Sequence, residues 1–162
     1  MFLTAHTPLS LVIGASITNP FLAFVLGFLG HFALDLIPHD SKKLHLWVKK
    51  QPLEKINKVY FLIEVAEFFI IFLLLAVLYL SNKLPLSYGL VAALIGGWLP
   101  DVLWGLNNLT QKRIKILNFY HKIHSFADDH FLTKYCLLPI YGEILVQLFF
   151  TAVFLFLYLK IV

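Results

Sequence analysis

Charged residues and cysteines are scarce in this sequence. Only 14% of the 162 residues are charged, whereas 60% are hydrophobic and the mean hydropathy is +0.83. Soluble domains are about half apolar and about one-quarter charged. The composition therefore excludes an ordinary soluble domain and predicts an integral membrane protein. The single cysteine, Cys136, excludes an internal disulfide and any metal site built from several thiolates.

Other signals are missing as well. The first residues, MFLTAHTPLS, carry no basic residue ahead of the apolar run, so they lack the charged start of a secretory signal and are expected to belong to the mature protein. The sequence contains no repeat of fixed period and no low-complexity tract. We therefore expect residues 1–162 to form one membrane-embedded helical domain, a compact all-α bundle of about five to six helices.

Three segments are long and apolar enough to cross a bilayer. Residues 59–80 and 140–161 each cover about 30 Å of hydrocarbon as a helix. Residues 86–106 form a third crossing, which is interrupted by GGWLPD. Residues 112–126 have an apolar stripe and a basic face, a pattern typical of an amphipathic helix at the membrane interface.

The N-terminal apolar block, Leu9–Ile37, is divided by Asn19-Pro20. It could be one long tilted crossing. We favour a helical hairpin, with a short helix from Pro8 to Thr18 and a return helix from Phe21 to Leu36, because Asn-Pro is a turn signal and proline disfavours helical geometry at the preceding residue.

The positive charges gather in two loops. Of 13 Lys and Arg residues, six lie in 42–58 and five in 112–134. Because short basic loops stay in the cytoplasm, we expect a prokaryotic cytoplasmic (inner) membrane with both Lys-rich loops facing the cytoplasm. The first loop, with its aromatic residues, could suggest nucleic acid, but membrane lipids are the favoured partner. The residues predicted to contact anionic lipid headgroups are Lys42, Lys43, Lys49 and Lys50.

The polar residues of the apolar segments lie near the predicted cytoplasmic ends. Ionisable groups inside a membrane are expensive and by default find partners or line a functional site. His31 and Asp35 share a helix face at a spacing of four, and His124 and Asp128 repeat that spacing. With the nearby His39, His121 and Asp101, they supply the nitrogen and oxygen donors that divalent metals bind.

The LPD at 99–101 supports such a site. Pro100 frees a backbone carbonyl inside an apolar segment, and Gly96-Gly97 allows another helix to approach closely. The alternative is a plain helix kink with Asp101 as a cap.

Four stretches, HTPLSLVIGA, HFALDLIPH, GGWLPD and HKIHS, together resemble the YdjM-like family of membrane-bound metal-dependent hydrolases. The His-x3-Asp spacing also resembles the ligand set of zinc-dependent phospholipase C. The resemblance implies metal ligands at His6, His31, Asp35, Asp101, His121 and His124. The sequence departs from the family pattern in two ways: His-x3-Asp precedes LPD, and the further Asp and His expected after LPD are replaced by Val102, Leu103 and Trp104.

The expected function is a membrane-embedded hydrolase that acts on a phospholipid or another phosphoester at the cytoplasmic interface. Its cofactor would be a divalent metal ion, most plausibly zinc, which activates water. Glu64 and Asp128 are the candidate catalytic residues that accept the proton. The alternative is a non-enzymatic membrane protein with a metal site for structure, sensing or transport, or with a hydrogen-bonded network that holds no metal.

Overall fold

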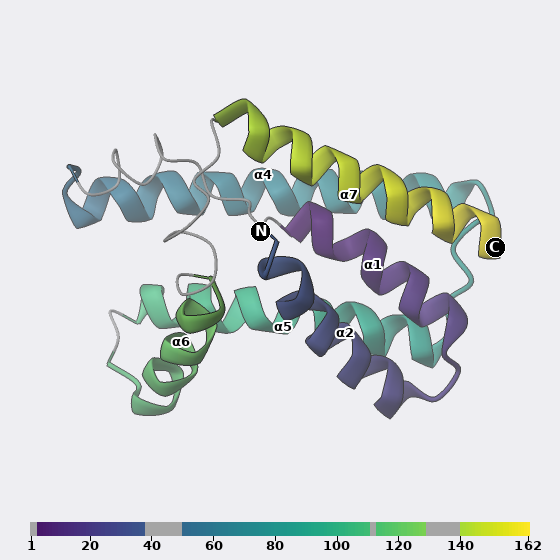
Figure 1. The fold of residues 1–162 in the computed structure, drawn as a ribbon, viewed down its shortest axis with the longest axis horizontal. Helices are drawn as coiled ribbons and strands as arrows, with labels where there is room; N and C mark the ends of the chain where they lie inside the picture. The colour runs from purple at the N-terminus through teal and green to yellow at the C-terminus, as the bar shows by residue number, and fades with distance from the viewer. Residues whose placement is uncertain (1–2, 38–49, 111–112, 129–139) are drawn as a thin grey trace.

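The computed structural model describes residues 3–37, 50–110, 113–128 and 140–162. Within these ranges it contains six helices and no strand, which confirms the all-helical prediction (Figure 1). The helices are α1 (Leu3–Ser16), α2 (Pro20–Asp35), α4 (Leu53–Leu80), α5 (Tyr88–Leu109), α6 (Lys115–Asp128) and α7 (Ile140–Ile161).

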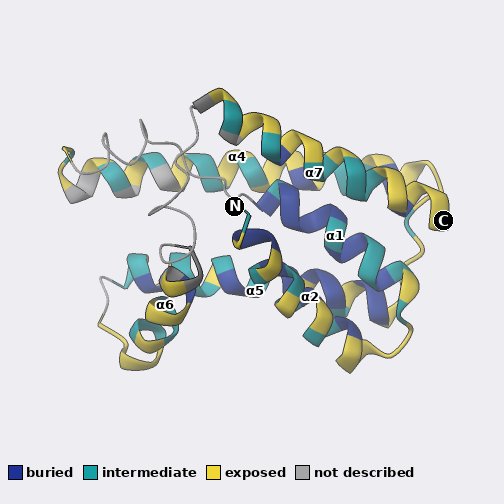
Figure 2. Cartoon of the chain, in the orientation of Figure 1, coloured by how far each residue is buried: buried dark blue, intermediate teal, exposed yellow. Residues whose placement is uncertain are grey.

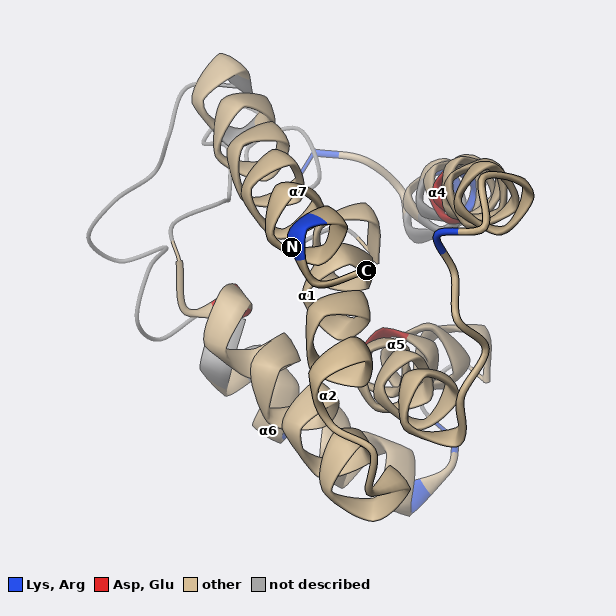
Figure 3. Cartoon of the chain, turned by 90° about the vertical axis from the view of Figure 1, so that its right-hand side faces the viewer, with Lys and Arg blue, Asp and Glu red and all other residues tan. Residues whose placement is uncertain are grey.

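Three of the helices, α4, α5 and α7, are long and apolar enough to cross a membrane. They correspond closely to the predicted crossings at 59–80, 86–106 and 140–161. Helices α4 and α7 run in the same direction and α5 runs in the opposite one, as Figure 1 shows. Acidic and basic residues are sparse along all three (Figure 3).

The N-terminal block forms the favoured helical hairpin. The side chain of Asn19 accepts a hydrogen bond from the backbone N–H of Leu22 at 3.1 Å, and Pro20 follows as the first residue of α2. An N-cap with proline directly after it is a strong helix start, which explains why the chain turns here.

The predicted start of the first helix, at Pro8, is wrong, because α1 begins at Leu3 and continues through the proline. A proline inside a helix leaves the carbonyl four residues earlier without its helical donor. Here that carbonyl belongs to Thr4, and it accepts a hydrogen bond from the Thr151 hydroxyl of α7 at 3.4 Å. The neighbouring helix therefore supplies a hydrogen-bond donor for the carbonyl of Thr4, because Pro8 has no N–H to donate.

Helix α1 is the most buried element of the bundle (Figure 2). It packs against α2, α5 and α7, and α4 contacts the rest of the bundle mainly through α1. Helix α5 approaches α1 and α2 very closely, because small residues face the backbone of the neighbouring helix: a Cβ added at Gly14 would meet the backbone of Leu90, and one added at Gly96 would meet the carbonyl of Phe24. The close approach expected at Gly96-Gly97 is thus present, and it brings the polar residues of three helices together.

Candidate metal centre

Five polar side chains from four helices meet inside the bundle. They are His6 from α1, His31 and Asp35 from α2, Asp101 from α5 and His124 from α6. His6, His31, Asp35 and His124 are each no more than 3% exposed. Their donor atoms form two overlapping groups in which the ligand atoms lie within 4.8 Å of one another: His6, His31 and Asp101, and His31, Asp35 and His124.

His31 lies at the middle of this cluster. Its Nε2 is 2.9 Å from Oδ2 of Asp35, which is one helical turn further along α2. The same nitrogen is 3.3 Å from Nε2 of His124 and 3.6 Å from Oδ1 of Asp101. A single ring nitrogen can donate at most one hydrogen bond, so Nε2 of His31 can donate to no more than one of these three neighbours.

The other ring nitrogen of His31 is already engaged. Its Nδ1 lies 2.8 Å from the carbonyl oxygen of Gly97 on α5. A carbonyl only accepts hydrogen bonds, so Nδ1 carries the proton and donates it, which leaves the lone pair of Nε2 directed at the cluster when the ring is neutral. A backbone carbonyl on the remote nitrogen is the arrangement that commonly orients a metal-binding histidine.

The spacing of the donor atoms fits a metal coordination sphere. Bonds of about 2.1 Å at angles of about 90° to 109° separate neighbouring ligand atoms by about 3.0 to 3.4 Å. In the cluster, His6 Nε2 is 3.2 Å from Asp35 Oδ1, and His124 Nε2 is 3.7 Å from Asp35 Oδ2 and 3.6 Å from Asp101 Oδ1. The residues present can therefore hold a divalent ion without a large rearrangement.

The electrostatics of the cluster also fit a cation. Burial, together with a smaller effect of the neighbouring His31, lowers the pKa of His6 to about 4, so the His6 imidazole is neutral near pH 7. Its ring stacks on that of His31 with centroids 3.9 Å apart and an angle of 18° between the planes. Two carboxylates, Asp35 and Asp101, add the negative charge. Buried carboxylates need a compensating partner, and a divalent cation bound beside them would supply one.

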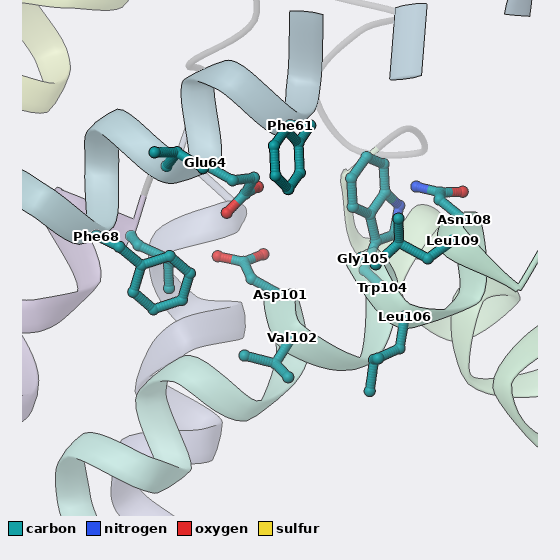
Figure 4. Close-up of a pocket in the computed structure, with 12 residues that line it drawn as sticks. Phe61, Glu64, Phe68, Asp101, Val102, Trp104, Gly105, Leu106, Asn108 and Leu109 are labelled. Carbon is teal, nitrogen blue, oxygen red and sulfur yellow. The ribbon is translucent and has the colours of Figure 1, made fainter. Parts of the chain in front are cut away.

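A cavity of about 280 Å³ opens beside the cluster, between α4 and α5. Asp101 belongs to the cluster and also lines this cavity. Figure 4 shows Glu64 of α4 and Asp101 pointing toward each other across it, with Phe61, Phe68 and Trp104 around them. The Asp101 side chain is 15% exposed, in contrast to 1% for that of Asp35, so Asp101 is the donor through which the cluster meets the cavity.

The structure does not bring every predicted site residue into the cluster. Among the described residues, His121 belongs to neither donor group; it is half-buried on α6, with its ring 6.2 Å from that of Trp104. Glu64 lies across the cavity, and Lys50 is exposed in the turn before α4. The predictions for His39, Lys42, Lys43 and Lys49 and for the Asp128 side chain fall outside the described residues.

Two features of the site were not predicted. The Gly97 carbonyl orients His31, and Glu67 of α4 accepts a hydrogen bond at 2.8 Å from the backbone N–H of Thr4, two residues before His6. Backbone acceptors leave no signal in a side-chain pattern. The only hint of the Glu67 contact was its presence with Glu64 in an otherwise apolar segment.

No family model matches this chain, and no curated protein or solved structure matches it either.

Proposed function

We propose that this protein is a membrane-embedded metal-dependent hydrolase. The observation that carries the proposal is the buried convergence of three imidazoles and two carboxylates from four helices, with donor atoms 2.9 to 3.7 Å apart. Nitrogen and oxygen donors in this combination suit zinc. The YdjM-like motifs support the same class, because four of the five donors lie within HFALDLIPH, GGWLPD and HKIHS, and His6 opens HTPLSLVIGA.

The residues divide into roles. His6, His31, Asp35, Asp101 and His124 would hold the ion, which when bound supplies an activated water and polarises the bond to be cleaved. The Gly97 carbonyl fixes the ring of His31. Glu64, on the far wall of the cavity, is positioned to accept the proton of the attacking water. The substrate class would be a phospholipid or another phosphoester.

The proposed setting is the inner membrane of a prokaryotic cell. The candidate spans of α4, α5 and α7 support membrane insertion. The Lys-rich segments 42–58 and 112–134 support an orientation in which the end of the bundle from which they emerge faces the cytoplasm. Lys50, which is exposed before α4, would then contact anionic headgroups.

The large number of donors favours a second candidate function, a structural or sensing metal site. Catalytic zinc sites keep an open position, whereas structural sites are closed by protein ligands. If all five donors bind one ion, no position is left for water or substrate. The partial exposure of Asp101 toward the cavity favours the hydrolase instead, because this is the side from which substrate could approach.

Metal analysis of the purified protein, followed by an activity assay, tests the proposal. We expect stoichiometric zinc in the wild-type protein and background zinc in His31→Ala. Glu64→Gln should retain the metal, because Glu64 belongs to neither donor group, but should lose hydrolysis of a phosphoester panel. Retained hydrolysis in Glu64→Gln would exclude Glu64 as the base. A wild-type protein that is purified without chelators and holds no stoichiometric metal would exclude the metal centre.

A further inference from the structure

The cavity between α4 and α5 has an almost entirely apolar lining. Helix α4 contributes Phe61, Val65 and Phe68, and helix α5 contributes Val102, Trp104, Leu106 and Leu109. Glu64 and Asp101 are the acidic residues of the lining, and they point toward each other in Figure 4. The cavity therefore combines apolar walls with two carboxylates.

Both walls of this cavity belong to candidate membrane spans. Phe61–Leu80 and Tyr88–Leu109 are each apolar enough to lie in a bilayer. Helix α4 packs chiefly on α1 rather than on α5, so the space between α4 and α5 is not closed by helix–helix packing. In a bilayer, a cavity between two spans opens laterally, and the surrounding medium at that depth is lipid hydrocarbon.

The size of the cavity restricts its occupant. A helix with its side chains is about 10 to 12 Å across, which is far too wide for a cavity of about 280 Å³. A single hydrocarbon chain is narrow and flexible enough to enter. Apart from Glu64, Asp101, Asn108 and the indole of Trp104, the lining is apolar, which suits a hydrocarbon chain better than the sugar or base of a water-soluble phosphoester.

We propose that this cavity binds one hydrocarbon chain of a lipid and that the lipid is the substrate of the adjacent centre. The substrate assignment rests on the proposed function, whereas chain binding does not. Asp101 connects the two sites, since it lines the cavity and also stands 3.6 Å from Nε2 of His31. A chain lying between Phe61 and Trp104 would bring its polar end to Glu64 and Asp101.

Gly105 offers a way to fill the cavity without disturbing the metal centre. It lines the cavity, and a Cβ added to it would meet no atom within 4 Å. Gly105→Leu therefore adds a branched side chain that starts in open space at the cavity. Gly105→Ala is the matched control, because it makes the same change in helix propensity while adding only one methyl group.

The test uses palmitic acid with a photoreactive diazirine at mid-chain, added to the full-length protein in phosphatidylcholine nanodiscs. Labelled peptides are mapped by mass spectrometry. We expect labelling of the wild-type protein and of Gly105→Ala around Phe61, Phe68 and Trp104. Labelling there should fall about tenfold or more in Gly105→Leu, a change of the size that extra methylenes produce in an apolar pocket. Label on the exposed α7 residues Leu148 and Phe149 reports ordinary lipid contact and should not change.

Two labelling results would overturn the inference: cavity labelling no stronger than that of α7, or cavity labelling unchanged by Gly105→Leu. A third result would also overturn it: a photoreactive benzoylphenylalanine placed at Phe61 that crosslinks to a second copy of the protein, because another chain would then fill the site. Chain labelling requires neither metal nor turnover. Loss of metal with retained labelling would therefore count against the proposed function alone, and stoichiometric metal without labelling would count against the cavity alone.

Discussion

The Nδ1 of His31 and the carbonyl oxygen of Gly97 are 2.8 Å apart, and this contact joins the face of α2 that carries His31 and Asp35 to the backbone of α5. It occurs next to Gly27 and Gly96, where an added Cβ would meet the backbone of the facing helix. Close packing and orientation of the metal donors therefore depend on the same few small residues.

We expect Gly97→Ala to weaken metal binding. A Cβ at this position would collide with the Ser10 hydroxyl, so the Gly97 carbonyl and the His31 ring that it orients must shift. Altered partners of metal-binding histidines typically cost about 10- to 100-fold in affinity. Zinc affinity can be measured by competition with a chelating dye.

A second substitution should relieve the clash between the Cβ added at position 97 and the Ser10 hydroxyl. Ser10→Ala removes the colliding oxygen and leaves the Ser10 Cβ at 3.4 Å from the added methyl group, an ordinary contact. The double variant Gly97→Ala/Ser10→Ala should recover most of the lost affinity. Additive losses in the two single variants and the double variant would disprove the steric explanation.

Two histidines of α6 are expected to behave differently. His124 lies in a donor group with His31 and Asp35, whereas His121 lies in neither group found among the described residues. His124→Ala should therefore reduce bound zinc to background, while His121→Ala should retain it. Elemental analysis of both purified variants decides the matter, and loss of zinc from His121→Ala alone would reverse the assignment.

Glu67 is expected to stabilise the start of α1. Its carboxylate accepts a hydrogen bond from the Thr4 N–H at 2.8 Å, and loss of a helix N-terminal acceptor costs about 1 kcal/mol. Glu67→Leu should lower the thermal unfolding temperature in detergent. Glu67→Gln keeps a carbonyl oxygen and should remain close to wild type; equal losses in the two variants would instead indicate that the negative charge is required.

Two glycines of α2 form a matched pair for helix packing. A Cβ at Gly27 would meet the backbone carbonyl of Ala93, which cannot move alone, whereas a Cβ at Gly30 would meet only the flexible ends of the Leu9 and Ile13 side chains. Gly27→Ala should destabilise the protein by about 1–3 kcal/mol, and Gly30→Ala much less. Thermal unfolding in one detergent compares them, and equal stabilities would contradict a tight α2–α5 contact.

The sequence predicts the long helices well, because a predominantly apolar run of span length has few other structures available. It predicts the start of α1 poorly. Pro8 suggested a helix start, but the carbonyl it leaves behind is satisfied by Thr151 from the other end of the chain, a contact that local patterns cannot reveal.

The side chains of the candidate metal centre were predictable from helix geometry. A spacing of four places His31 and Asp35 on one helix face, and the structure has them 2.9 Å apart. The same rule does not separate His121 from His124, because the rotation of α6 about its own axis is set by packing against α2 and α5. The Gly97 carbonyl was unpredictable, since it is a backbone group at a site defined only by tertiary structure.

Asp101 is shared by the buried donors and the cavity, and this sharing has a thermodynamic consequence. A molecule that enters between α4 and α5 changes the surroundings of one of the two carboxylates that face the imidazoles. Any change that occupancy of one site makes in the affinity of the other must be matched by the same factor in the opposite direction. Under the proposed function, a lipid chain in the cavity would then make the cluster bind its ion more tightly or more weakly.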